Sequence, residues 1–218
     1  MENLAKRLLN LSEESKNNFP PDVLALFDKS IKEIEENDFA KGLNEGDKAP
    51  DFDLPNATGM NVKLSEELKK GPAIVTFYRG GWCPYCNMQL RAYQQVLDQI
   101  HEAGAQLFAI SPQSPDASLD TQDKNDLTFQ VLSDVGSKVA TNYNLAYRLP
   151  NYLINLYKTM GDQLNLPQIN ADESWTLPVT GTFVIDMNGV IRLAHLDPDF
   201  KKRLEPKEIH DVLKQLQK

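Results

Sequence analysis

A continuous apolar run that leads into a double glycine and a close pair of cysteines most constrains how this chain can fold. Residues 73–78 read Ala-Ile-Val-Thr-Phe-Tyr, the composition of a strand buried on both faces of a sheet. The chain continues with Arg79, Gly80, Gly81, Trp82, Cys83, Pro84, Tyr85 and Cys86. Proline is tolerated in the first turn of a helix, because its missing N–H would be unpaired there. The sequence therefore predicts that a buried strand passes into a helix at the cysteines.

A second apolar run predicts the neighbour of this strand. After the cysteines, Leu90 and Ile100 belong to an expected helix that stops before Gly104, and residues 105–110 form the next apolar segment. A strand, a helix and a second strand in this order form a right-handed unit with parallel strands. We expect residues 73–78 to pair in parallel with 105–110, with Cys83 at or beside the start of the helix.

The remaining segments complete an α/β fold. Helices are expected over about 116–126 and 138–143, around a short strand at 129–132. The Asn-Gly pair at 188–189 predicts a hairpin between two strands, 181–186 and 190–196, and Pro206 suits the first turn of a last helix. Residues 144–178 are the least regular and indicate one helix near 152–160. A mixed sheet with a parallel centre, an antiparallel hairpin edge and helices on both faces is what a thioredoxin-like fold requires.

The domain organisation follows from length and apolar spacing. A chain of 218 residues fits one domain with an appendage. Residues 1–45 are expected to form an N-terminal helical extension and residues 46–218 the main domain. Leucines at 4, 8 and 11 share one face of a first helix, and a second helix is expected to stop at Gly42. These apolar stripes either pack on the main domain or form the contact of a homodimer, and both interpretations stay open.

The charge balance excludes some partners. Lys and Arg number 23 and Asp and Glu 31, so the formal net charge is −8. This balance argues against nucleic acid or an anionic membrane surface, since both need clustered cations. The basic run Lys201-Lys202-Arg203 stands among acidic residues and is interpreted as a solvated surface. With neither a membrane span nor a signal peptide recognised in the sequence, we expect a cytoplasmic protein.

The chain has two cysteines, Cys83 and Cys86, which predict redox chemistry. Unpaired N–H groups at a helix start stabilise a thiolate, and thiol pKa values in Cys-X-X-Cys turns fall below the usual value. Zinc would need two more ligands, and the three histidines are scattered. No metal and no cofactor is therefore predicted. A nucleophile elbow and a glycine-rich phosphate loop are also not recognised.

Motifs spread over the chain carry a family resemblance. They are Gly46-Asp47-Lys48-Ala49-Pro50-Asp51-Phe52-Asp53-Leu54, Phe77-Tyr78-Arg79-Gly80-Gly81-Trp82-Cys83-Pro84-Tyr85-Cys86, Ile110-Ser111-Pro112, Phe129-Gln130-Val131-Leu132-Ser133-Asp134, Gly181-Thr182-Phe183-Val184-Ile185-Asp186, Asn188-Gly189, and Asp197-Pro198-Asp199-Phe200 before Glu205-Pro206. With them the chain resembles the peroxiredoxin-like branch of the alkyl hydroperoxide reductase and thiol-specific antioxidant (AhpC/TSA) family, in the thioredoxin-like superfamily.

The resemblance implies roles for single residues. On the peroxiredoxin pattern, Cys86 takes the position of the peroxidatic cysteine, Cys83 that of a threonine and Arg79 that of a proline. The family's arginine would fall near Thr180, where this sequence has none. On the thioredoxin pattern, Cys83 is the attacking thiol and Cys86 resolves, with Thr180 in the position of a cis-proline. Cys-Pro-Tyr-Cys also matches the active site of glutaredoxins.

The function implied by the resemblance is a thiol-dependent peroxidase. A thiolate attacks the O–O bond of a hydroperoxide, and the resulting sulfenic acid condenses with the second cysteine to a disulfide. A thioredoxin- or glutathione-type reductant then restores the pair. One alternative is a thioredoxin- or glutaredoxin-like disulfide oxidoreductase without real peroxidase activity. Another is a binding module whose cysteine pair switches a partner surface.

Three further residues are candidates for the substrate pocket: Arg79, Trp82 and Thr180. Arg148 is a candidate replacement for the missing arginine. The order of attack depends on the argument used. Helix electrostatics favour Cys83 as the more exposed sulfur with the lower pKa, and we expect it to be the more reactive thiol towards disulfides and alkylating agents; family position favours Cys86 as the sulfur that attacks a small peroxide.

Overall fold

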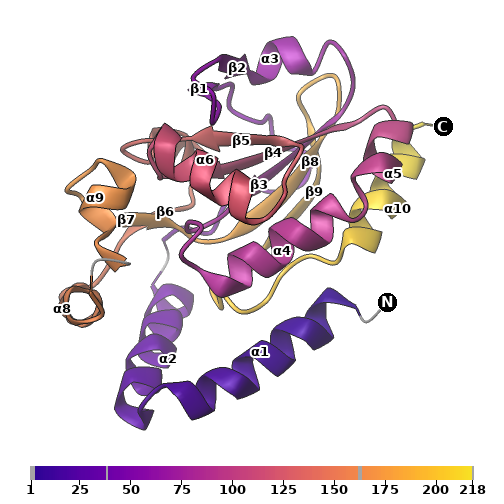
Figure 1. Ribbon diagram of the computed structural model, residues 1–218. Coiled ribbons are helices and arrows are strands. Elements are labelled where there is room, and N and C mark those ends of the chain that lie inside the picture. Colours follow the sequence, from indigo (N-terminus) through magenta and orange to yellow (C-terminus); the bar gives the residue numbers. More distant parts are fainter. Residues whose placement is uncertain (1–2, 38, 162–163, 218) are drawn as a thin grey trace.

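A five-stranded mixed sheet forms the centre of the molecule (Figure 1). The computed structural model describes residues 3–37, 39–161 and 164–217. In spatial order the strands are β5 (Gln130–Ser133), β4 (Gln106–Ser111), β3 (Ala73–Phe77), β8 (Gly181–Ile185) and β9 (Ile191–Leu196). β3, β4 and β5 are parallel, β8 pairs antiparallel with β3, and β9 pairs antiparallel with β8. The predicted thioredoxin-like fold class is confirmed, including the parallel pairing of β3 with β4 and the hairpin edge.

Successive side chains of β3 point to opposite faces of the sheet and pack in two separate hydrophobic cores. Ile74 packs on the face covered by α4 (Pro84–Gln94), α5 (Leu97–Glu102) and α10 (Pro206–Leu216). Val75 and Phe77 pack on the other face, with α7 (Lys138–Asn142) and the hairpin of β1 (Asp53–Pro55) and β2 (Asn61–Lys63). All five residues of β3 are buried. A strand buried on both faces positions the residues after it rigidly, and those residues are the cysteine turn.

The helix after the cysteines is divided, whereas the sequence predicted one helix up to Gly104. α4 ends at Gln94 and α5 begins at Leu97, because the intervening Val96 has a non-helical backbone (φ −113°, ψ 10°). Two short helices, α3 (Leu64–Glu67) and α6 (Pro115–Lys124), complete the connections near the sheet.

The N-terminal helices pack on the main domain, as the simpler interpretation predicted. α1 (Leu4–Asn18) lies along α4 and buries Leu4 and Leu8 in the core that contains the cysteines (Figure 1). α2 (Pro21–Glu36) contacts α8 (Asn151–Thr159). These faces are buried within one chain, which removes the argument for a homodimer contact there; the homodimer itself stays a prediction.

The predicted stop of the second helix at Gly42 is wrong, because α2 ends six residues earlier. The backbone of Asn37 is extended, and its side-chain amide donates to the carbonyl of Glu33 at 2.6 Å. Gly42 instead forms a turn with φ +72°, where its N–H donates to the carbonyl of Asn144 at 2.8 Å.

The segment that the sequence left least regular folds into a small layer beside the sheet. The predicted helix is α8 (Asn151–Thr159). The structure adds α9 (Leu166–Asn170) and an antiparallel pair, β6 (Ala146–Arg148) with β7 (Thr176–Pro178). Leu149, Leu153 and Leu177 form the core of this layer, against which Phe27 of α2 packs. In the described part of the chain, no helix is long and apolar enough to cross a membrane.

Candidate active site

The double glycine makes the turn between β3 and α4 possible. Gly80 has φ +146°, and a Cβ atom there would collide with the indole of Trp82. A Cβ atom on Gly81 would collide with the side chain of Thr121 in α6. The N–H of Gly81 donates to Gln113 Oε1 at 2.7 Å, which ties the turn to the loop after β4. The backbone therefore delivers the cysteines directly to the first turn of α4.

Both cysteines are buried at the start of α4. Cys83 is its N-cap residue and Cys86 is its third helical residue, with exposed fractions of 1% and 0%. Cys83 is the more exposed sulfur only by 1% against 0%, so neither sulfur is open to solvent, because residues of α1 and α2 surround the helix start. The two thiols hydrogen-bond to each other, with Cys83 donating to Cys86 Sγ. The two cysteines are free in this structure.

A guanidinium group contacts one of the two sulfurs. Arg203 Nη2 donates to Cys86 Sγ at 3.6 Å, and Nη1 donates to the carbonyl of Lys202 at 2.7 Å. The interpretation of the basic run as a solvated surface is wrong for Arg203, which is buried. The loop between β9 and α10 folds back on α4, and Tyr93 Oη of α4 donates to the carbonyl of Leu204 at 3.2 Å.

These contacts distinguish the two thiols electrostatically. Burial alone would raise the pKa of Cys86, but the hydrogen bond from Cys83 and the charge of Arg203 lower it to about 5. The N–H of Arg79 also donates to Cys86 Sγ. Burial and the neighbouring thiolate raise the pKa of Cys83. The expectation that Cys83 has the lower pKa is therefore wrong, because the contacts lower the pKa of Cys86 and raise that of Cys83.

Arg79 is not a surface cation, because its side chain is buried beside the thiols. Nη2 donates to Tyr157 Oη at 2.5 Å. The guanidinium carbon lies 5.0 Å from the ring centre of Trp82 and 4.4 Å from that of Phe200, where the ring faces attract a cation. The half-buried indole of Trp82 also packs edge-on against Tyr157, with 5.9 Å between ring centres. Arg79 and Trp82 are thus brought together with the cysteines.

Thr180 and Arg148 are not linked to the sulfurs by any contact found among the described residues. Thr180 is buried and its Oγ1 has no partner. It precedes Gly181, which pairs with Phe77 at the end of β3, so a role for Thr180 at the site stays a prediction. No described peptide bond is cis. Arg148 is exposed and donates to Asn151 Oδ1 at 3.4 Å, whereas a guanidinium group that contacts Cys86 is that of Arg203.

A pocket of about 220 Å³ reaches Cys83. Its walls are mainly apolar and aromatic, and they come from α1, α2, α8 with the residues after it, and the loop before α10. The residues that line it are Ser12, Ser15, Lys16, Phe19, Leu24, Phe27, Asp28, Arg79, Trp82, Cys83, Pro84, Tyr85, Tyr157, Met160, Leu164, Phe200 and Lys201. Cys86 is not among them. One sulfur therefore faces the pocket, and the other faces Arg203.

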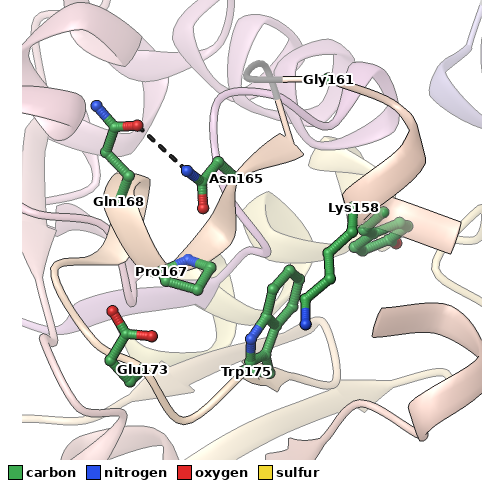
Figure 2. Close-up of a pocket in the computed structure, with 8 residues that line it drawn as sticks. Lys158, Gly161, Asn165, Pro167, Gln168, Glu173 and Trp175 are labelled. Carbon is green, nitrogen blue, oxygen red and sulfur yellow. Dashed lines mark hydrogen bonds between the residues drawn. The ribbon is translucent and has the colours of Figure 1, made fainter. Parts of the chain in front are cut away.

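A larger hollow of about 480 Å³ lies over α8 and α9 (Figure 2). In Figure 2 the side chain of Lys158 extends toward Trp175, with Nζ 5.7 Å from the ring centre. Asn165 and Gln168 hydrogen-bond to each other at the rim. No cysteine lines this hollow. Of the described residues that line this hollow, Tyr157 also lines the pocket over Cys83, and it accepts the hydrogen bond from Arg79.

Sequence reasoning missed Arg203 and the pocket walls. The signal for Arg203 was its place between the quoted motifs Asp197–Phe200 and Glu205-Pro206, followed directly by an apolar Leu204. The walls from α1 and α2 had no comparable signal, because an amphipathic stripe does not say which surface it covers.

The sequence comparisons agree with this geometry. The pattern of the AhpC/TSA family matches residues 45–194. A chloroplastic peroxiredoxin Q of Gentiana triflora is 29% identical over 180 residues, covering 82% of this chain and 69% of that protein. A putative peroxiredoxin of Mycobacterium tuberculosis is 37% identical over 99 residues, covering 45% of this chain and 62% of that protein.

Solved structures show the same fold. Peroxidoxin BcpB of Mycobacterium tuberculosis superposes with a TM-score of 0.62 at 20% identity, covering 80% of this chain and 98% of that one. A PrxQ mutant of Xylella fastidiosa gives a TM-score of 0.62 at 16% identity, covering 81% and 98%. The family pattern spans more than half of the residues and includes both cysteines, so this chain belongs to the AhpC/TSA family.

Proposed function

We propose that this protein is a thiol peroxidase that reduces hydroperoxides with Cys86 as the attacking thiolate. One observation carries the proposal. Cys86, which the family resemblance puts at the peroxidatic position, is the sulfur whose pKa is lowered to about 5 beside Arg203. At neutral pH its sulfur is therefore a thiolate, which is the nucleophilic form of cysteine.

In the first step, Cys86 Sγ attacks the terminal oxygen of the hydroperoxide. The S–O bond forms as the O–O bond breaks, and the alkoxide or hydroxide that leaves takes up a proton to become an alcohol or water. Arg203 holds the thiolate in position, and its charge stabilises the anion that develops. It supplies a cation although the sequence has neither the threonine nor the arginine of the family pattern.

In the second step, the sulfenic acid on Cys86 condenses with the thiol of Cys83. The S–S bond forms, and the hydroxyl group leaves as water with the proton of the Cys83 thiol. The existing hydrogen bond between the two sulfurs supports this step, because it already holds them in contact. An external thiol then reduces the disulfide.

A disulfide oxidoreductase acting on folded proteins is the weaker candidate. Such an enzyme needs a thiolate that is exposed enough to reach a disulfide in another protein. Both sulfurs here are buried, and the pocket over Cys83 is small. Peroxide is small enough to react in a buried site.

Two assays on the reduced protein, each with a chemical thiol as electron donor, test the proposal. One measures the consumption of peroxide and the other measures the reduction of insulin disulfides. We expect catalytic loss of hydrogen peroxide or an alkyl hydroperoxide, and insulin reduction no faster than the donor alone. Insulin reduction without peroxide turnover would reject the peroxidase and establish the disulfide oxidoreductase.

A further inference from the structure

The pocket over Cys83 restricts which thiol can complete the cycle. After oxidation the electrophile is the Cys83–Cys86 disulfide, and a reducing thiolate must approach one sulfur in line with the S–S bond. Of the two cysteines, Cys83 lines the pocket and Cys86 does not. The pocket holds about 220 Å³, below the usual range of roughly 300–1,000 Å³ for drug-sized ligands.

The N-terminal helices close this pocket to a macromolecule. Ser15 of α1 hydrogen-bonds to Tyr85 within the cysteine turn at 3.2 Å. Phe27 of α2 packs edge-on against Phe200, with ring centres 6.1 Å apart. Asp28 forms an ion pair with Lys201 at 3.3 Å. Even small redox complexes between proteins bury several hundred Å² on each partner, and the sulfur of Cys83 offers no such surface.

The interior of the pocket suits a thiolate. Arg79 lines the wall, and its buried Nε has no hydrogen-bond partner within the part of the chain that the structure describes. Among the described residues no carboxylate forms an ion pair with this guanidinium; its contacts are a tyrosine hydroxyl and two aromatic rings. In the reduced protein the Cys86 thiolate interacts with this positive charge, but the Cys83–Cys86 disulfide is uncharged, so in the oxidised protein the buried cation attracts another anion. The apolar walls accept a small carbon skeleton.

We infer that the physiological reductant is a compact thiol of low molecular weight that enters this pocket and attacks Cys83, rather than a thioredoxin-type protein. This inference rests on the proposed peroxidase function and names its reductant. The thiolate forms a mixed disulfide with Cys83, and the electron pair of the S–S bond passes to Cys86, whose thiolate Arg203 stabilises. A second thiol attacks the mixed disulfide and releases the Cys83 thiol. Two small thiols thus become one small disulfide.

The test starts from full-length protein whose disulfide has been formed with diamide, so that it does not depend on peroxidase activity. Its reduction is followed with 2-mercaptoethanol and, separately, with a thioredoxin kept reduced by its reductase, and rate constants are compared per thiolate. We expect thioredoxin to be no faster than 2-mercaptoethanol. A thioredoxin rate about tenfold or more above the small thiol would overturn the inference, because the helices would then admit a protein.

A pair of variants tests the route of entry. Leu24→Trp fills the pocket from α2 and should slow reduction by 2-mercaptoethanol about tenfold. Leu9→Trp is the matched control, because Leu9 is 58% exposed on α1 and should leave the rate unchanged. Equal rates in the two variants would overturn entry through the pocket. Melting curves of both proteins verify folding, and failure of the reduced protein to react with peroxide would reject the proposed function alone.

Discussion

The segment that carries the family pattern and the segments that flank it contribute different things to the site. Residues 45–194 supply the sheet, the double glycine and both cysteines. The flanks supply the guanidinium beside Cys86 and much of the wall over Cys83: Arg203 and Phe200 follow the matched segment, and α1 and α2 precede it.

The two flanks are also joined to each other. Glu205, at the start of α10, accepts hydrogen bonds from the N–H groups of Leu4 (3.2 Å) and Ala5 (2.6 Å) in the first turn of α1. The same carboxylate takes part in the capping box of α10. The matched segment therefore holds the nucleophile and its turn, whereas the flanks hold the charge beside it and part of the wall that limits access to it. The following predictions test this division, from the largest expected effect to the smallest.

Removing the guanidinium of Arg203 should have the largest effect on the peroxidase reaction. Arg203→Gln keeps hydrogen-bond donors but loses the charge at Cys86. We expect the rate constant with hydroperoxide at neutral pH to fall about 10²–10³-fold, the usual loss when one positioned donor to a developing anion is removed. Stopped-flow mixing of the reduced variant with peroxide measures it. Lys202→Gln is the matched control, because Lys202 is exposed; equal losses in both would refute the specific role of Arg203.

The N-terminal flank should behave as part of one core. Leu8→Ala removes a buried side chain between α1 and α4 and should lower the free energy of unfolding by about 2–4 kcal/mol. Leu9→Ala, on the exposed side of the same helix, should change it by less than about 0.5 kcal/mol. Urea unfolding followed by circular dichroism measures both. A small effect of Leu8→Ala would mean that α1 is not docked.

The pH dependence of the rate with peroxide should show whether Arg203 acts through its positive charge or only through packing. The wild-type rate with peroxide should rise as pH increases through about 5 and level off above, because the reactive thiolate forms above the pKa of Cys86. Loss of the positive charge in Arg203→Gln should move this midpoint upward by about one pH unit, equivalent to about 1.4 kcal/mol. Ultraviolet absorbance of the thiolate follows the titration. An unmoved midpoint would show that Arg203 does not stabilise the anion.

The smallest effect concerns the contact between α1 and the cysteine turn. Ser15 and Tyr85 share a hydrogen bond of 3.2 Å, and such a bond contributes about 0.5–1.5 kcal/mol. The variants Ser15→Ala and Tyr85→Phe, alone and together, form a double-mutant cycle for the free energy of unfolding. We expect a positive coupling energy within that range, and zero coupling would contradict the contact.

Much of the fold could be predicted because its signals are local. The apolar run at 73–78, the glycines after it and the Asn-Gly hairpin each determine a nearby structure. The pair β6–β7 was missed, since it joins segments that lie far apart in the sequence. The helix break at Val96 was also missed, and no glycine or proline marks it.

At the site, the sequence identified the cysteine pair but misjudged its surroundings. Exposure of Cys83 was inferred from its place at a helix start, whereas α1 and α2 bury it. Arg203 was assigned to solvent from its charged neighbours, whereas the loop before α10 turns it inward. Both errors concern tertiary contacts that bring residues more than fifty positions apart in the sequence together.

The most direct test of the account compares the reduced Cys83→Ser and Cys86→Ser variants in rapid mixing with hydroperoxide, followed by dimedone trapping and mass mapping. We predict that Cys83→Ser consumes one equivalent of peroxide and carries the dimedone adduct on Cys86, whereas Cys86→Ser reacts no faster than a free thiol. A fast reaction of Cys86→Ser, with the adduct on Cys83, would contradict the assignment of Cys86 as the attacking thiolate.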